Sequence, residues 1–293
     1  MKKHRIISKA HRRERLSSFL FLLPSLLGLC TFYILPFFLI GWYALVDDPV
    51  SMRFVGLKNF TTLFHNAAFL QAMRNTVLFS SAVVPLGVVI SLFLALALQQ
   101  AIPGKSRFRT IFLSPMMIPV ASIVLIWQVL FHQDGFINSI VPSFAGIDWL
   151  KSDWGQVVIV TLYLWKNTGY YMVLFLAALS NLPQHLVEMA RIEGANACWI
   201  FFRVKLRYLS ATILFVVILS FINSFKAFRE VYLLVGDYPY SSLYLTQHFM
   251  NNLFRTLDYP HISAAALIMF LGICVLIAIL FFVEGHFGKD VEM

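Results

Sequence analysis

The sequence predicts an all-α, polytopic membrane protein with six transmembrane helices, and its composition carries that prediction. Hydrophobic residues make up 59% of the 293 residues, while charged residues make up only 13%. The mean hydropathy is +0.77. Soluble domains run at about 45–50% apolar and about 25% charged residues. A soluble globular enzyme is therefore excluded, and three widely spaced cysteines indicate neither a disulfide framework nor a metal site.

Six apolar runs are long enough to cross a bilayer, which takes about 20 residues. The spans are expected at Ser18–Leu45, Thr76–Gln99, Thr110–Phe131, Gln156–Ser180, Ser210–Val235 and Ile262–Glu284. The first run is too long for a signal peptide and no small-residue cleavage site follows it, so we expect a retained helix. The transmembrane domain is accordingly expected over residues 18–284.

Lysine and arginine are distributed unevenly between the two sides of the predicted bundle. If the N-terminus is cytoplasmic, the inside segments hold fifteen of these residues and the outside loops hold five. Cytoplasmic loops of membrane proteins carry an excess of Lys and Arg. We therefore expect a cytoplasmic arm at 1–17 and a cytoplasmic tail at 285–293. The net charge of +9 then reports topology rather than nucleic-acid binding.

The inside loop 181–209 combines helix signals with exposed apolar residues. Pro183 suits a first helical turn, and Gly194 suits the residue just past a helix end. The pattern predicts a helix over 183–193, a turn, and a second helix over Ala195–Arg207. Met189 and Ile192 are bulky and apolar, so such a helix needs a protein groove or a membrane surface to cover it.

This loop resembles the EAA loop of the permease subunits of bacterial ABC importers. The residues that match the family pattern E-A-A-x-x-x-G-A in spacing are Glu188, Ala190, Gly194 and Ala195. Ile192-Glu193 stands where the sugar-importer branch has Ile-Asp. The departures are Met189 for the second alanine, Trp199 for a usual glutamine and Arg207 for the usual proline.

Four further motifs occur in the family's order along the chain. They are Gly56–Phe60, Arg109–Pro115, Asp134–Asn138 and Trp165. The set resembles carbohydrate-uptake permeases of the maltose type, which implies the type I ABC importer permease architecture in a bacterial plasma membrane. The resemblance also implies that loop 181–209 is a coupling helix that docks in a cytoplasmic ATPase. The residues expected to make that contact are Glu188, Ala190, Ile192, Glu193, Gly194 and Ala195.

A translocation path needs polar groups on one helix face, because polar groups facing lipid are costly. Two spans carry polar or small residues at i, i+3, i+4, i+7, which lie on one face. The predicted path residues are Tyr163, Lys166, Asn167 and Tyr170 in the fourth span and Ser220, Asn223, Ser224 and Ala227 in the fifth. The alternative is that these groups hold helices together by interhelical hydrogen bonds.

Lys166 stands out because of its depth. It lies about 15 Å into a hydrocarbon core of about 30 Å, where a cation costs at least about 2.5–3.5 kcal/mol. It must therefore face protein or water. Lys166 would suit an acidic sugar, whereas Lys226 can pair with Glu230 at i, i+4.

The sequence thus predicts a transmembrane subunit of an ATP-driven oligosaccharide importer, and not an enzyme. It implies a second, different permease, two ATPase subunits and an extracytoplasmic sugar-binding protein as partners. No cofactor is expected on this chain, since ATP and Mg belong to the ATPases. The alternative class is a carrier or channel that works without ATP.

Overall fold

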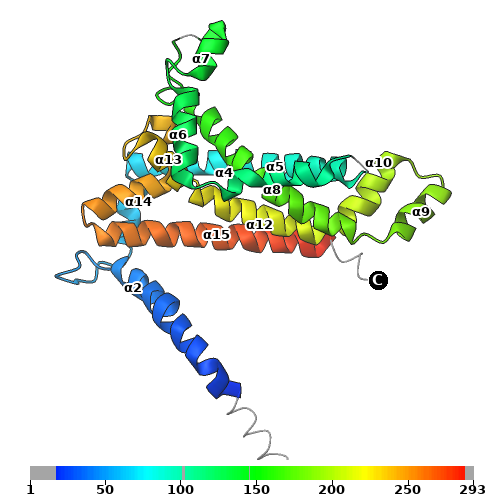
Figure 1. Ribbon diagram of the computed structural model, residues 1–293. Coiled ribbons are helices and arrows are strands. Elements are labelled where there is room, and N and C mark those ends of the chain that lie inside the picture. The colour runs from blue at the N-terminus through cyan, green and yellow to red at the C-terminus, as the bar shows by residue number, and fades with distance from the viewer. Residues whose placement is uncertain (1–17, 101–102, 145, 288–293) are drawn as a thin grey trace, which may run out of the picture. The chain divides into compact units, whose positions relative to one another are not determined.

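The computed structural model describes residues 18–100, 103–144 and 146–287. The predicted N-terminal arm 1–17 and most of the predicted tail 285–293 lie outside the described residues. In the described part the chain forms helices joined by turns and loops, with one isolated bridge between Val46 and Phe54 (Figure 1). The all-α prediction is confirmed.

The first helix covers Ser18–Tyr43. Its middle, η1 (Cys30–Ile34), is a π-helical stretch, and its last nine residues, Leu35–Tyr43, are labelled α2. The other helices are, in order, α2 (Leu35–Tyr43), α3 (Lys58–Phe64), α4 (Ala67–Gln99), α5 (Lys105–Met117), α6 (Val120–Phe131), α7 (Phe136–Ile140), η2 (Pro142–Phe144), α8 (Gly155–Ser180), α9 (Gln184–Ile192), α10 (Ala197–Trp199), η3 (Ile200–Lys205), α11 (Leu206–Tyr208), α12 (Ser210–Lys226), α13 (Phe228–Val235), η4 (Ser241–Leu243), α14 (Thr246–Arg255) and α15 (Tyr259–Phe287).

Within the described residues, five helical segments are long and apolar enough to cross a membrane. They are Ser18–Tyr43, Ala67–Gln99, Val120–Ile140, Ser210–Val235 and Tyr259–Gly285. The fourth predicted span appears as α8, whose 26 residues would reach about 39 Å. Its middle carries the polar run Lys166, Asn167 and Thr168, and it is not among the five.

The third predicted span is not one helix, and this corrects the prediction of a continuous Thr110–Phe131 segment. The chain leaves the helix at Ile118 and Pro119, which have extended ψ values of 134° and 137°. Proline has no N–H and disfavours helical backbone in the residue before it. The fifth span remains one segment, Ser210–Val235, with a single-residue turn at Ala227 between α12 and α13, where the backbone stays helical (φ −60°, ψ −18°). The C-terminal parts of these two spans, α6 and α13, pack against each other.

The chain divides into two compact units. Among the described residues, the first comprises 18–65 with 253–269, and the second comprises those between 66 and 252 together with 270–287. In the first unit the buried Asn59, part of the Gly56–Phe60 motif, donates to the carbonyls of Ala44 and Val46 at 3.0 and 2.8 Å. A motif residue thereby fixes the turn that follows the first helix.

The second unit is built around α4 and α8, which pack along each other, with α12 against α4 and α5 against α8. Its largest apolar cluster centres on the fully buried Tyr171, Met172 and Phe175 of α8. In the Asp134–Asn138 motif, Asn138 accepts from Trp149 Nε1 at 2.6 Å and donates to the Ile147 carbonyl at 2.9 Å. This closes the loop between α7 and α8.

Gly169 sets the spacing between α5 and α8. A Cβ atom added there would overlap the Phe112 carbonyl of α5. Small residues let helix backbones approach closely in membrane proteins, where packing rather than the hydrophobic effect drives helix association. The crossing of α5 over α8 therefore requires glycine at this position.

We expect Gly169→Ala to destabilise the protein by about 1–3 kcal/mol, the range for overpacking. The measurement is thermal unfolding of the purified protein in detergent. Gly272→Ala in α15 is the matched control, because its added Cβ meets open space. Equal melting temperatures for the two variants would contradict the close approach of α5 and α8.

Candidate functional site

The loop 181–209 forms a helix–turn–helix hairpin that confirms the predicted local structure. Helix α9 ends at Ile192, and Gly194, two residues later, has a φ of +84° in the left-handed region. The Ala195 N–H donates to the Ala190 carbonyl at 2.9 Å, which satisfies a carbonyl that the helix leaves open. Asn196 then caps the following helix by accepting from the Trp199 N–H at 2.8 Å. That helix runs without a break through α10, η3 and α11.

The two faces of α9 differ in exposure. Ala190 is buried and lies toward the helix that follows, next to Trp199 and Val204. Ile192 is 86% exposed and Met189 is 56% exposed. The small side chain of Ala190 is thus used for packing inside the hairpin, whereas the outward face presents uncovered apolar groups.

Glu188 lies beside a basic cluster. It lines a cavity of about 350 Å³ together with Arg191 and Lys205, between α9 and the end of α4. The Lys205 Nζ donates to Gln99 Oε1 at 3.0 Å. Burial and, to a smaller degree, the nearby Arg191 lower the pKa of Lys205. Among the described residues Glu188 has no ion-pair partner, so its carboxylate is available to another protein.

Part of the predicted path lies inside the packing of α4, α8 and α12. The buried Tyr163 hydroxyl contacts the Tyr171 hydroxyl at 3.0 Å and donates to the Ser220 carbonyl at 2.6 Å. Ser224 and Ser80 form a hydroxyl pair at 2.8 Å. Ala227, which forms the turn before α13, is also buried. These groups make interhelical hydrogen bonds and packing contacts, as the alternative interpretation expects.

The other predicted path residues keep part of their surface. Asn167 donates to the Tyr163 carbonyl at 2.9 Å, and Asn223 donates to the Tyr171 hydroxyl at 3.1 Å. Tyr170 packs on Tyr171, with ring centroids 6.0 Å apart. The three side chains are half-buried; Asn167 and Asn223 extend the same polar network, whereas Tyr170 contacts it through its ring.

Lys166 forms an ion pair with Glu230 of α13. The Lys166 side chain is 19% exposed and the Glu230 side chain 7%. Glu230 therefore pairs with Lys166. The i, i+4 spacing along the helix predicted Lys226 as its partner instead. The sequence pattern did not place Glu230 in the site. A usable signal was present, because the single acid of the fifth span, Glu230, and the single base of the fourth span, Lys166, can neutralise each other.

Glu230 keeps one unused acceptor. Its Oε2 is buried and has no hydrogen-bond partner among the described residues. An unpaired charge near the middle of a membrane is costly, so the ion pair explains how Lys166 is tolerated at that depth. Within the same residues, no group of three or more His, Cys, Asp or Glu side chains is placed to hold a metal ion.

The features described so far are membrane-crossing helices and an exposed hairpin, and both are compatible with a transport permease. Residues 87–292 match the family model described as the binding-protein-dependent transport system inner membrane component. The chain belongs to this family. It is a multi-pass inner-membrane protein, and the resemblance to ABC importer permeases is confirmed.

Curated relatives point to the same family. The chain is 32% identical over 220 residues to the sn-glycerol-3-phosphate transport system permease protein UgpA of Escherichia coli O6:K15:H31 (strain 536 / UPEC), covering 73% of this chain and 74% of that protein. UgpA of Yersinia enterocolitica serotype O:8 / biotype 1B (strain NCTC 13174 / 8081) is 32% identical over 214 residues, covering 71% and 72%.

Solved structures confirm the fold. A chain of a bacterial ABC transporter involved in the import of the acidic polysaccharide alginate superposes with a TM-score of 0.79 at 21% identity, covering 98% of this chain and 99% of that one. A chain of the bacterial alginate ABC transporter in complex with alginate pentasaccharide-bound periplasmic protein gives 0.78 at 19% identity, covering 97% of each.

The ion pair between α8 and α13 leads to a stability prediction. Lys166→Met or Glu230→Gln alone should lower the free energy of unfolding by about 3–5 kcal/mol, because each leaves a buried partner unpaired. The double variant Lys166→Met with Glu230→Leu should recover much of that loss. Thermal unfolding in detergent measures both effects.

Lys226→Met is the matched control for this series, because Lys226 is exposed. It should melt close to the unchanged protein. Single variants that melt like the control would contradict a structural role for the pair.

Proposed function

We propose that this chain is a transmembrane subunit of an ATP-driven importer for oligosaccharides. It forms the translocation path together with a second, different permease, and two cytoplasmic ATPases, which hold ATP and Mg, drive the cycle. An extracytoplasmic binding protein delivers the sugar. Family membership supports the importer class, and it argues against a carrier that works without ATP.

The observation that carries the coupling proposal is the outward face of α9. This face presents the apolar Met189 and Ile192 beside the unpaired Glu188. A helix that exposes such side chains needs a partner surface. A cleft in the ATPase would cover the apolar pair, and a cation there would neutralise Glu188.

The remaining predicted contact residues serve the shape of this surface. Gly194 and Ala195 form the turn that ends α9, and Glu193 lies exposed at that end. Ala190 allows α9 to lie close to the next helix, so it acts on the partner only by fixing the angle of the hairpin. Both chain termini lie in the cytoplasm on this proposal, in agreement with the distribution of Lys and Arg.

For the substrate path, the proposal separates two kinds of residue. Lys166, Asn167, Tyr170 and Asn223 are half-buried and can face a cavity that the second permease completes. Tyr163, Ser220, Ser224 and Ala227 are buried and position them. The pairing of Lys166 with Glu230 neutralises that cation, so Lys166 alone gives no reason to favour an acidic sugar.

The relatives and solved structures support a sugar-like substrate. UgpA is named for sn-glycerol-3-phosphate, a phosphorylated polyol, and the structural neighbours import alginate, an acidic polysaccharide. Both ligands combine hydroxyl groups with acidic groups, and they differ in size. We extend the polyhydroxylated character of the substrate to this chain, because the oligosaccharide proposal needs no more than that.

The coupling proposal predicts that Glu188→Arg combined with Gly194→Ala abolishes co-purification of the ATPase. The first change reverses the charge on the docking face. The second puts a side chain at a backbone φ of +84°, which costs about 1–2 kcal/mol and shifts the turn. Affinity purification of the whole complex from membranes measures the effect.

A control with the same two kinds of change, Glu284→Arg with Gly285→Ala at the end of α15, should keep the ATPase bound. Insertion of both variants into the membrane is checked in parallel. An ATPase that remains bound to the Glu188→Arg, Gly194→Ala complex would refute the assignment of α9 as the coupling helix.

A further inference from the structure

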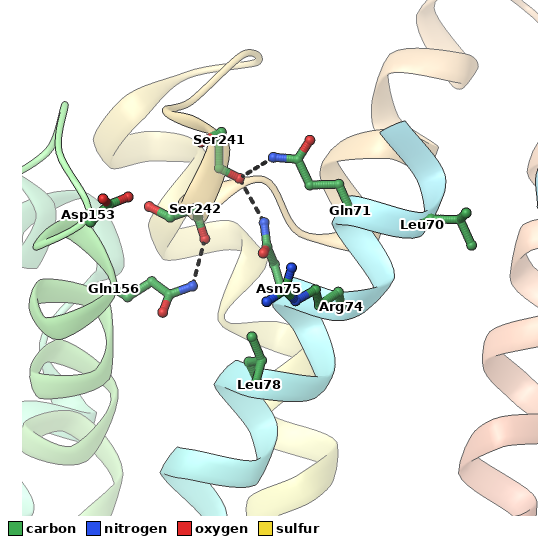
Figure 2. A pocket seen from close by; sticks show the side chains of 9 residues that line it. All are labelled: Leu70, Gln71, Arg74, Asn75, Leu78, Asp153, Gln156, Ser241 and Ser242. Carbon is green, nitrogen blue, oxygen red and sulfur yellow. Dashed lines mark hydrogen bonds between the residues drawn. The ribbon is translucent and has the colours of Figure 1, made fainter. Parts of the chain in front are cut away.

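A second cavity lies between the N-terminal ends of α4 and α8 and has a volume of about 620 Å³. The hairpin of α9 follows the opposite, C-terminal end of α8. Figure 2 shows its walls, which come from α4, from α8 and from the segment that contains η4. The lining residues are Leu70, Gln71, Arg74, Asn75, Leu78, Asp153, Gln156, Ser241 and Ser242.

Side-chain amides hold the walls of this cavity together. Gln71 and Asn75 donate to the Ser241 carbonyl at 3.0 and 2.7 Å, and Gln156 donates to the Ser242 carbonyl at 3.1 Å (Figure 2). These bonds fix one segment against two helices. The amide oxygens of Gln71 and Gln156 accept no hydrogen bond within the described residues, so they remain available.

Two charged side chains line opposite sides of the same cavity. Arg74 belongs to α4, whereas Asp153 comes just before α8 (Figure 2). Both are exposed, and neither has an ion-pair partner in the described part of the chain. The cavity therefore offers a cationic donor on α4 and an anionic acceptor before α8, with Leu70 and Leu78 of α4 as apolar lining one turn before and after Arg74.

We propose that this cavity is a binding subsite for a neutral sugar unit at the extracytoplasmic mouth of the subunit, an inference that rests on the proposed importer function. A sugar hydroxyl both donates and accepts, so one ring can donate to Asp153 and accept from Arg74. An anion would be attracted by Arg74 and repelled by Asp153, and a metal cation would meet the reverse, so the opposite charges give neither an advantage over a neutral ligand. The volume lies in the range of about 300–1,000 Å³ that small-molecule sites occupy.

The cavity lies where an incoming sugar would bind before it reaches the polar groups farther along α8. Gln156 and Tyr163 are seven residues apart, which puts them on one face of α8, about 10 Å apart along its axis. Asn167 follows on the same face four residues later. Polar groups thus continue from the cavity toward the network at Tyr163 and Tyr171.

Site-specific labelling tests the subsite. The complete complex, with the three native cysteines of this chain changed to alanine and with Ser241→Cys, is reconstituted in nanodiscs and treated with a maleimide. All three native cysteines are exposed, and alanine adds no polar group facing lipid, so these changes should be tolerated. Maltotriose, a neutral probe, should slow the labelling. An alginate trisaccharide, an acidic probe, should protect less.

Arg74→Met and Asp153→Asn should each raise the maltotriose concentration for half-protection about tenfold, as expected for a lost hydrogen bond to a charged group. Lys151→Met is the matched control, since Lys151 lies outside the cavity and pairs with Asp148. It should leave protection unchanged.

Absence of protection by both probes would overturn the subsite. Protection by the acidic probe alone, strengthened by Asp153→Asn, would also overturn it, because the cavity would then be an anion site. ATP hydrolysis separates this result from the proposed function. A complex still stimulated by its sugar-loaded binding protein, but without protection at Ser241→Cys, keeps the importer function and loses the subsite.

Discussion

The close packing of α4 along α8 is the contact on which the second unit depends. Most of what is buried there is apolar, yet the contact also encloses hydroxyl groups that need partners in an environment without water. Tyr163, Tyr171 and Ser220 satisfy one another, and Ser80 pairs with Ser224 of α12. Gly87 of α4 lies close to the side chains of Tyr171 and Ser220. Hydrogen bonds and small residues therefore hold these helices together, as is usual within membranes.

This packing links the two ends of the unit. At one end, Gln71 and Asn75 of α4 and Gln156 of α8 hold the segment at Ser241 and Ser242. At the other, Lys205 bonds to Gln99 at the end of α4, and the Tyr208 hydroxyl donates to the Asn181 carbonyl just after α8.

The hairpin of α9 is thus tied to the ends of both central helices. A force applied to α9 would act directly on α4 and α8. A flexible loop would absorb the same force. The divided third span adds a second feature, because α6, beyond the break at Pro119, packs against α13. The ion pair of Lys166 and Glu230 then connects α8 to this pair of helices.

Local features of this structure were predictable from the sequence, whereas contacts between distant residues were not. The helix, the Gly194 turn and the second helix of the hairpin follow from residues next to one another in the chain. Pro119 was a readable signal for the break between α5 and α6, since proline interrupts helices. The single-residue turn at Ala227 was not predictable, because alanine favours helix.

The partner of Lys166 lies 64 residues away, and spacing along one helix offered the wrong pairing for Glu230. The face that Ala190 presents also depends on how the hairpin folds back. The residues that line the cavity at Arg74 and Asp153 come from three separate segments, so no local pattern brings them together. Periodicity identifies which residues share a helix face, but it does not say which neighbour that face meets.

The central claim is that this chain moves sugar only when ATPases act on it. The most direct measurement is uptake of labelled oligosaccharides into proteoliposomes, with a mixture of neutral and acidic sugars outside and ATP either enclosed or omitted. Vesicles that contain both permeases, the ATPases and the binding protein should accumulate sugar only with ATP inside. Accumulation by this chain alone, driven by an ion gradient without ATPases, would contradict the account.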